Sequence, residues 1–347
     1  MPVTAPRTLR RRLAVLLACG LLGLAAPSLA PAPAFAGQAG SGTGQAVRIT
    51  EFTPPTPNSG PVGITGGPDG NVWFTENGAN RIGRITPRGR ITEFPLPAPD
   101  RFPDDITAGS DGNLWFTEPA ANRIGRITPR GRVTEFALPT ADAFPIGITR
   151  GPDGNVWFTE NGSNRIGRIT PRGRITEFPL PTPDSFPYRI TKGPDGNLWF
   201  TMPFANKIGR ITPQGKVTEF PLPNPEGGPF NITTGPDGNL WFTDSGGLDN
   251  EIGRITPRGK VTRFPLPTRA AGPIGIAAGP DGNVWFTESN VNRIGRITPR
   301  GRITEFPLPA SSPDSTPFHI TAGPDGNMWF TELTGNRVGR VDLRGRG

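Results

Sequence analysis

The chain has few of the residues on which redox, metal and acid–base sites are usually built. Its 347 residues include one cysteine (Cys19), one histidine (His319) and one tyrosine (Tyr188). Because Cys19 lies in the first 36 residues, the rest of the chain can form neither a disulfide nor a cysteine-ligated metal site. After residue 36 no apolar run approaches the roughly 20 residues that span a membrane. No later segment suggests a helix, so we expect an all-β fold without a transmembrane segment.

The first 36 residues indicate a secretory signal peptide. They begin with four arginines, continue with a mostly apolar stretch over residues 13–30 and end at Ala34-Phe35-Ala36. A basic start, an apolar centre and a small-residue cleavage site are typical of such signals. Cys19 follows the arginines after only six residues, so we favour cleavage after Ala36 over lipoprotein anchoring at Cys19. The mature protein is then secreted, and residues 37–45 form a flexible lead.

The charge balance is mild once this signal is removed. The chain has 37 basic and 29 acidic residues, and four of the arginines lie in the signal. The mature net charge is therefore about +4, which together with export argues against nucleic acid as a partner.

A ten-residue motif organises the remainder. Residues 67–76 read Gly-Pro-Asp-Gly-Asn-Val-Trp-Phe-Thr-Glu, and close copies follow six times. All seven tryptophans lie in these copies, at spacings of 42, 42, 42, 42, 44 and 44 residues: Trp73, Trp115, Trp157, Trp199, Trp241, Trp285 and Trp329. A fixed period of this length is typical of repeat architectures.

Each repeat contains four short strand patterns separated by turns. In the first repeat the strands are expected at 61–65, 71–76, 81–86 and 90–94, with Pro- and Gly-containing turns between them. Seven units of four antiparallel strands predict a seven-bladed β-propeller over residues 46–347. The expected blades are 61–97, 103–139, 145–181, 187–223, 229–267, 273–309, and 317–343 with 46–53.

The two ends of the array predict how the ring closes. The last unit, from Pro317 onward, lacks a fourth strand, whereas Arg48-Ile49-Thr50-Glu51-Phe52 at the start matches that strand. We expect this N-terminal strand to complete the seventh blade. Closure removes free sheet edges, so we expect a monomer.

The copies differ most at the start of each innermost strand, which we place at the mouth of the central channel. The equivalent pairs are Val62-Gly63, Asp104-Asp105, Ile146-Gly147, Tyr188-Arg189, Phe230-Asn231, Ile274-Gly275 and Phe318-His319. The only tyrosine and the only histidine are among them. Candidate ligand-binding residues are therefore Asp104, Asp105, Tyr188, Arg189, Phe230, Asn231, Phe318 and His319.

The residue after each Trp-Phe-Thr forms a second series, which we expect to face the mouth: Glu76, Glu118, Glu160, Met202, Asp244, Glu288 and Glu332. Carboxylates on one face suit a hard cation such as Mg2+ or Ca2+. The structural interpretation is that each caps a turn or pairs with an arginine such as Arg81 or Arg84, and regular repetition favours it. Glu288 and Glu332 are the candidate metal ligands.

The opposite face carries basic turns, such as the one with Arg88 and Arg90, beside the aspartates of the Pro-Asp-Gly turns. A solvated surface is the default interpretation of such turns, and docking to an anionic wall polymer is the second.

The motifs Gly-Pro-Asp-Gly-Asn-x-Trp-Phe-Thr-Glu, Asn-Arg-Ile-Gly-Arg-Ile-Thr-Pro and Ile-Thr-Glu-Phe-Pro-Leu-Pro closely resemble the virginiamycin B lyase (streptogramin lyase) family over residues 46–347. The resemblance implies a seven-bladed propeller and a Mg2+-assisted elimination that opens a cyclic depsipeptide, with histidine as the base.

The positions that the resemblance assigns to the base are Ile274 and Phe318 here, and those for the metal-binding glutamates are Thr316 and Glu332. His319 follows Phe318 directly, and by strand alternation we expect it to point to the other side. The catalytic candidates are therefore His319 and Glu332.

Two functions remain open. The first is a secreted, non-catalytic module that binds a small molecule, peptide, glycan or envelope ligand at the mouth, and the apolar base positions favour it. The second is a lyase with rearranged residues and bound Mg2+.

Overall fold

A computed structural model describes residues 47–246, 250–311 and 314–343. The expected signal peptide and flexible lead, residues 1–45, lie outside the described residues. From Arg48 onward the chain forms one compact unit. Within the described ranges, no helix is both long and apolar enough to cross a membrane.

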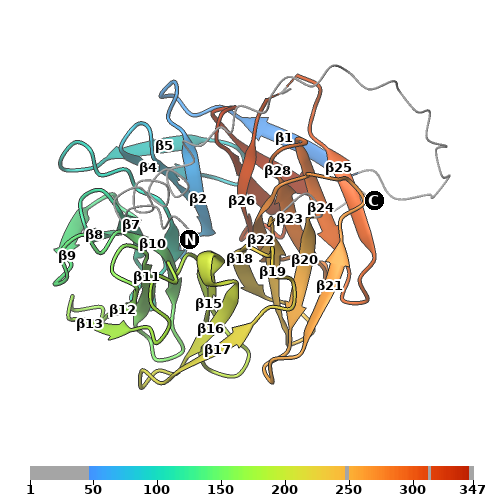
Figure 1. The fold of residues 1–347 in the computed structure, drawn as a ribbon. Helices are drawn as coiled ribbons and strands as arrows, with labels where there is room; N and C mark the ends of the chain where they lie inside the picture. Colours follow the sequence, from blue (N-terminus) through green and yellow to red (C-terminus); the bar gives the residue numbers. More distant parts are fainter. Residues whose placement is uncertain (1–46, 247–249, 312–313, 344–347) are drawn as a thin grey trace, which may run out of the picture. The chain divides into compact units, whose positions relative to one another are not determined.

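Seven four-stranded antiparallel sheets form the ring of a β-propeller (Figure 1), which confirms the predicted fold class. Blade 1 contains β2 (Pro61–Gly66), β3 (Val72–Glu76), β4 (Arg81–Ile85) and β5 (Ile91–Pro95). Blade 2 contains β6 (Ile106–Ala108), β7 (Leu114–Glu118), β8 (Arg123–Ile127) and β9 (Val133–Ala137). Blade 3 contains β10 (Pro145–Arg150), β11 (Val156–Glu160), β12 (Arg165–Ile169) and β13 (Ile175–Pro179).

The remaining blades repeat this order. Blade 4 contains β14 (Ile190–Lys192), β15 (Leu198–Met202), β16 (Lys207–Ile211) and β17 (Val217–Pro221). Blade 5 contains β18 (Pro229–Thr234), β19 (Leu240–Asp244), β20 (Glu251–Ile255) and β21 (Val261–Pro265). Blade 6 contains β22 (Pro273–Ala278), β23 (Val284–Glu288), β24 (Arg293–Ile297) and β25 (Ile303–Pro307). Blade 7 contains β26 (Pro317–Ala322), β27 (Met328–Glu332), β28 (Arg337–Asp342) and β1 (Arg48–Phe52).

One short helical turn departs from the expectation of strands alone. Residues Pro203–Ala205 form the 3-10 turn η1 between β15 and β16. Blade 4 has Pro203-Phe204-Ala205 where blade 2 has Pro119-Ala120-Ala121, which forms an ordinary turn, so the proline alone does not account for η1.

Both faces of each blade are buried, because each blade packs between two others. In β3, Trp73 faces blade 2, where it joins Leu114 and Phe116, whereas Phe74 on the other face packs with Trp329 of blade 7. The hydrophobic core is therefore a series of interfaces between successive blades.

The Trp-Phe-Thr and Ile-Gly-Arg triplets meet in one stacked unit. In blade 3 the rings of Trp157 and Phe178 stack with centroids 5.4 Å apart, and the Arg168 guanidinium lies 5.4 Å from the Trp157 ring centroid. A Cβ atom on Gly167 would lie 2.1 Å from the Phe158 ring, so only glycine fits between Ile166 and Arg168. Aromatic pairs contribute about 0.5–1.5 kcal/mol beyond their buried area, and the stack recurs in all seven blades.

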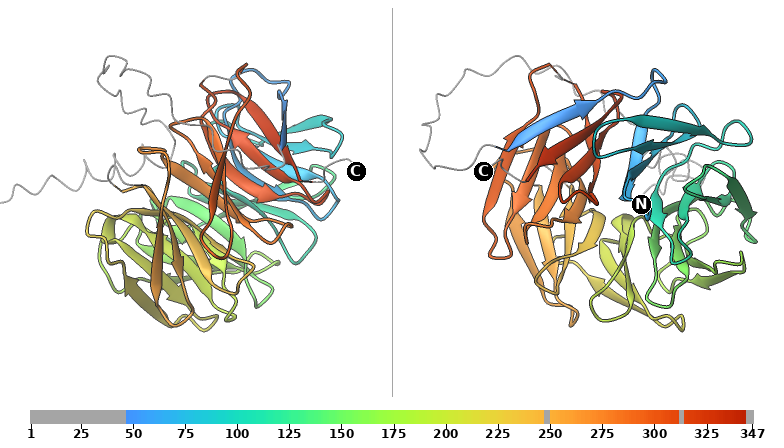
Figure 2. Two further views of the ribbon diagram at one scale, coloured as in Figure 1. Left: turned by 90° about the vertical axis from the view of Figure 1, so that its right-hand side faces the viewer. Right: turned by 180° about the vertical axis from the view of Figure 1, so that it is seen from behind.

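The N-terminal strand completes the seventh blade, as predicted. Strand β1 pairs antiparallel with β28, with Arg48 opposite Asp342 and Phe52 opposite Val338. Figure 2 shows the blue strand β1 beside the red strands of blade 7 in the view from behind. Phe52 also stacks on Trp329 with centroids 5.6 Å apart, so the last blade receives its outer aromatic ring from the start of the chain.

Candidate functional site in the channel lining

The residue pairs that vary among the blades lie in a break of the strand pattern. In blades 1, 3, 5, 6 and 7 the register shifts between the first residue of the innermost strand and the fourth, as between Pro61 and Ile64. In blades 2 and 4 regular pairing begins only at Ile106 and Ile190. The side chains of the two residues before regular pairing therefore need not point to opposite faces of the sheet in turn.

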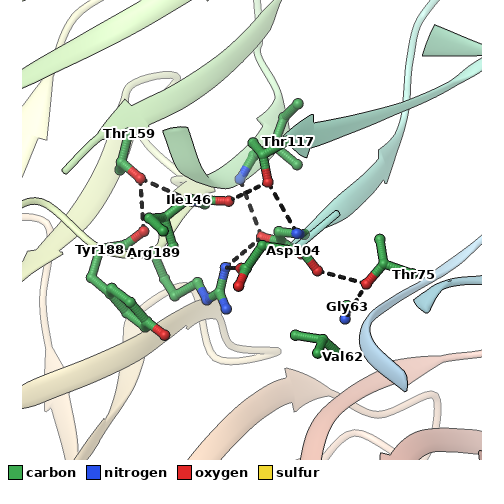
Figure 3. A network of polar contacts seen from close by, with 12 residues as sticks. Val62, Gly63, Thr75, Asp104, Thr117, Ile146, Thr159, Tyr188 and Arg189 are labelled. Carbon is green, nitrogen blue, oxygen red and sulfur yellow. Dashed lines mark hydrogen bonds and ion pairs between the residues drawn. The ribbon is translucent and has the colours of Figure 1, made fainter. Parts of the chain in front are cut away.

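A threonine from each Trp-Phe-Thr triplet fixes these breaks (Figure 3). The Thr75 hydroxyl accepts a hydrogen bond from Gly63 N in its own blade at 2.8 Å and donates to the Asp104 carbonyl of the next blade at 2.7 Å. The equivalent pair of bonds is made by Thr117, Thr159, Thr201, Thr243, Thr287 and Thr331. This belt of threonines holds the channel-lining backbone rigidly and explains why the threonine is repeated.

Glycines alternate with larger residues around this belt. Its second positions read Gly63, Asp105, Gly147, Arg189, Asn231, Gly275 and His319. A Cβ atom on Gly147 would lie 2.6 Å from the Tyr188 carbonyl oxygen and 2.8 Å from the Arg189 Cα. Gly63 and Gly275 approach Asp105 and His319 in the same way. The ionisable residues of this series are Asp105, Arg189 and His319. Each lies in the blade after one that has glycine at this position, and the missing side chain leaves room for it.

Arg189 is the centre of the channel lining. Its Nη1 atom lies 2.7 Å from Asp104 Oδ1 (Figure 3). The same atom lies 3.4 Å from Asp105 Oδ2, so an ion-pair triad joins blades 2 and 4. The guanidinium lies 4.7 Å from the centroid of the Tyr188 ring, and that ring contacts Phe230 at 4.4 Å between centroids. Arg189 and Asp104 are only 2% and 1% exposed, so this charged cluster is buried.

Burial and pairing act in opposite directions on the two aspartates. Burial raises the pKa of Asp104 to about 6, against the lowering effect of Arg189, and the neighbouring Asp105 raises it further. Burial also raises the pKa of Asp105, although Arg189 and the backbone N–H groups of Ile148 and Ile106 oppose this. Arg189 thus faces two carboxyl groups whose pKa values are both raised by burial.

Two members of the cluster keep unused polar atoms. Arg189 Nε and Nη2 have no hydrogen-bond partner among the described residues, and the same holds for His319 Nε2. Burial and then the charge of Arg189 lower the pKa of His319 well below its usual value, so the imidazole is neutral at pH 7. Buried donors and acceptors without partners are rare in folded proteins, which marks this lining as a candidate ligand site.

The expectation that His319 points away from Phe318 is wrong. The two rings are stacked, with centroids 5.0 Å apart and planes 16° from parallel. Strand alternation does not apply here, because the pair lies in the register shift between Pro317 and Ile320. The channel cluster thus includes Asp104, Asp105, Tyr188, Arg189 and His319, with Phe230 and Phe318 beside it. Asn231 turns its side-chain carbonyl toward its own strand, accepting a hydrogen bond from Ile232 N.

The repeated glutamates lie elsewhere, contrary to our expectation that they face the mouth. Glu76, Glu118, Glu160, Glu288 and Glu332 are completely buried. Each is near the outer-strand glutamate of its own blade, as Glu118 is to Glu135 and Glu288 to Glu305. Burial first, and then these neighbours, raise the pKa of Glu118 and Glu288 to about 8 and that of Glu332 to about 7. They belong to the interfaces between blades and the connecting segments.

The candidate metal ligands Glu288 and Glu332 come from different blades, and each adjoins its own outer glutamate, Glu305 and Glu51. Among the described residues no group of three or more histidine, cysteine or acidic side chains is placed to hold a metal ion.

Blade 5 contains a charge reversal that the sequence interpretation missed. Elsewhere a basic residue beginning the third strand adjoins a glutamate of the outer strand, as Lys207 does at 2.8 Å from Glu219. In blade 5 the acid is Glu251 and the base is Arg263, and they pair directly. The exchange keeps the ion pair and confirms that this position is structural.

The virginiamycin B lyase family model matches residues 40–183 and 149–346, which together cover most of the chain. The chain belongs to this family. A virginiamycin B lyase from Staphylococcus aureus is 44% identical and superposes with a TM-score of 0.81, covering 86% of this chain and 100% of its own. A catalytically inactive histidine-to-alanine variant of that enzyme, crystallised with quinupristin, is 43% identical over the same shares with the same TM-score.

The virginiamycin B lyase of Bacillus licheniformis is 51% identical over 43 residues. That match spans 12% of this chain and only 15% of the relative.

Family membership explains the scaffold more fully than the channel. The threonine belt and the stacked Trp–Phe–Arg units repeat in all blades, whereas the Asp104–Arg189–Asp105 triad joins just two of them. Two signals in the sequence, the constant threonine and the alternating glycines, would have located the belt before the structure did.

Proposed function

We propose that this virginiamycin B lyase-like propeller is a binding module whose channel cluster holds a short or cyclic peptide. The buried Arg189 supports this proposal. Its Nη1 is used by the aspartates, while Nε and Nη2 have no partner among the described residues. Backbone carbonyl groups of a peptide would accept hydrogen bonds from these donors.

The surroundings of Arg189 suit the same ligand class. Neutral His319 has a nitrogen that can pair with a peptide amide, and the partly exposed Phe230 offers apolar ring surface beside the buried rings of Tyr188 and Phe318. Pockets with apolar walls and a few fixed polar groups are typical of small-ligand sites.

The second function is a carbon–oxygen lyase in which His319 removes a proton next to a carbonyl. The lowered pKa of His319 favours it, since only the neutral imidazole accepts a proton. The positions that the family resemblance gives to the base, Ile274 and Phe318, have no ionisable group.

A bound Mg2+ would polarise that carbonyl, but the described residues do not fit it. Glu288 and Glu332 are each enclosed beside another glutamate, and Thr316 stands at the other ligand position. Mg2+ requires near-octahedral oxygen ligands, and these enclosed side chains do not provide them, so the proposed proton transfer assigns no role to a metal.

Quinupristin is the probe that separates the two functions. The purified protein is incubated with quinupristin and Mg2+, with and without EDTA, while calorimetry measures binding and mass spectrometry follows linearisation. We expect binding that His319→Asn weakens and the exposed control Glu226→Gln does not, with the ring of quinupristin left intact. An EDTA-sensitive linear product would contradict the non-catalytic proposal. The absence of binding by quinupristin and by short wall peptides would contradict a peptide site.

A further inference from the structure

The ends of the blades that carry the β4–β5 type turns form a second surface, which we call the turn face. Six of its turns carry eleven exposed basic residues: Arg88, Arg90, Arg130, Arg132, Arg172, Arg174, Lys216, Arg258, Lys260, Arg300 and Arg302. Within the described part of the chain, none of the eleven forms an ion pair with a carboxylate. Their positive charges are therefore not neutralised by the protein.

The acidic residues of the same face are already engaged. Asp111 accepts a hydrogen bond from Trp115 Nε1 at 3.1 Å and another from Asn113, and Arg126 lies 3.9 Å away. Burial would raise the pKa of Asp111, but these hydrogen bonds outweigh it and lower the pKa. The aspartate of every Pro-Asp-Gly or Ser-Asp-Gly turn accepts the same bond from its tryptophan.

The basic turns are held rigidly at each blade junction. In the turn of blade 3, Thr170 and Arg174 exchange hydrogen bonds, and the Pro171 carbonyl accepts a bond from Arg126 of blade 2 at 2.9 Å. Gly173, at a φ of 87°, leaves room for the Phe136 ring, because a Cβ atom there would lie 2.3 Å from it. The stacked unit of one blade thus supports the basic turn of the next.

The opposite ends of the blades carry mainly exposed acids, with the exposed Arg269 among them. At equivalent places in the connecting segments there, the exposed residues Asp100, Asp142, Asp184, Glu226 and Asp314 are acidic. The propeller is therefore polarised, with cations on the turn face and acids around the channel mouth. A polyanion would approach by the turn face and be repelled from the mouth.

We propose that the turn face docks on a flexible polymer of repeating phosphodiester groups without bases, such as a poly(glycerol phosphate) of the cell envelope. Nine of the eleven cations are arginines, whose guanidinium groups bind phosphate oxygens bidentately. Nucleic acid would also need ring surface for its bases. The exposed large apolar side chains among the described residues, Phe102 and Phe204, lie at the mouth end. Docking in this way leaves the channel mouth open to solvent.

The test compares two variants with the same change of net charge on opposite faces. Arg130→Gln/Arg132→Gln removes two cations from one turn. Asn58→Asp/Ala270→Asp adds two acids at the mouth end, where Asp100 and Asp142 have the same left-handed backbone. Binding to fluorescent poly(glycerol phosphate) is measured across a salt series, with glycerol 3-phosphate and oligothymidylate as comparison ligands.

We expect wild-type binding to weaken steeply with salt. The arginine variant should lower the slope of log affinity against log salt by about 2, since each phosphate contact contributes about 1, and the mouth variant should leave it unchanged. Equal weakening by both variants would show that net charge alone matters and overturn the proposal. Tighter binding of oligothymidylate at equal phosphate concentration, or no binding of the polymer at low salt, would overturn it as well.

Discussion

The repeated motif contributes to both ends of each blade, but its side chains are constant at the turn face and variable at the channel mouth. At the turn face the aspartate, tryptophan, phenylalanine and arginine recur in every blade, and the seven Asp–Trp hydrogen bonds all measure 2.9–3.1 Å. At the channel mouth the backbone is equally constant, because the threonine belt fixes it, but the side chains differ from blade to blade. The comparison teaches that a repeat protein can vary its side chains where a side-chain hydroxyl, rather than strand pairing, holds the backbone.

The largest effect should come from the unique end. Arg189→Met leaves Asp104 and Asp105 buried without their cation, and breaking a buried ion pair costs about 3–5 kcal/mol. Arg168→Met at the turn face, where the arginine is partly exposed, should cost about 1 kcal/mol. Urea unfolding at pH 7 measures both.

The loss of stability caused by Arg189→Met should depend on pH. Without Arg189 the folded-state pKa of Asp104 rises further above about 6, so the deficit should shrink as the pH falls from that higher pKa toward 6, below which Asp104 is protonated in both proteins. Adding Asp104→Asn and Asp105→Asn should restore most of the stability at pH 7. Equal losses for Arg189→Met and Arg168→Met would remove the distinction between the two ends.

A smaller effect is expected from the buried glutamates, which belong to neither surface. Burial raises the pKa of Glu118 to about 8, so its stabilising contribution is complete below the unfolded pKa and is lost as the pH rises through 8. Glu118→Gln should match the wild type near pH 4 and exceed it by roughly 2 kcal/mol near pH 6, since stability is lost at about 1.4 kcal/mol per pH unit between the unfolded and folded pKa values. Thermal unfolding across this range is the measurement, with the exposed Glu226→Gln as control. A stability difference that does not change with pH would contradict this interpretation.

The smallest effect tests the constancy of the turn face. Asp111→Ala and Asp237→Ala each remove a hydrogen bond to the tryptophan Nε1, and each should cost about 1 kcal/mol. Because the two sites have the same partners in different blades, the costs should agree within about 0.5 kcal/mol. Urea unfolding followed by tryptophan fluorescence measures both, and a clear inequality would show that the blades are energetically distinct at this end.

The fold could be predicted from the sequence because the period repeats every local signal seven times. The closing strand followed from the surplus Arg48–Phe52 and the incomplete last unit, and β1 pairs with β28 as expected. Comparison of the repeats identified the channel residues, but it did not show which of them are in contact. Arg189 and Asp104 are 85 residues apart and meet only because the ring places blades 2 and 4 around one channel.

Strand alternation predicted the wrong direction for the His319 side chain, because the register shift has no mark in the sequence other than the proline before it. It misled for the glutamates as well. Glu76 shares a face with Phe74, and that face is turned to the preceding blade rather than to the channel.

Whether glycines and larger residues can alternate regularly around the ring depends on whether the number of blades is even or odd. Around an even number of blades, small and large residues could alternate without exception, and the lining could repeat itself by symmetry. Seven is odd, so two residues of the same kind must be neighbours somewhere, and here they are the large residues Arg189 and Asn231. The ring therefore has one junction, between the blades of Arg189 and Asn231, that differs from the others although the repeats are nearly identical. Arg189 at this junction pairs with Asp104 and Asp105 across the channel.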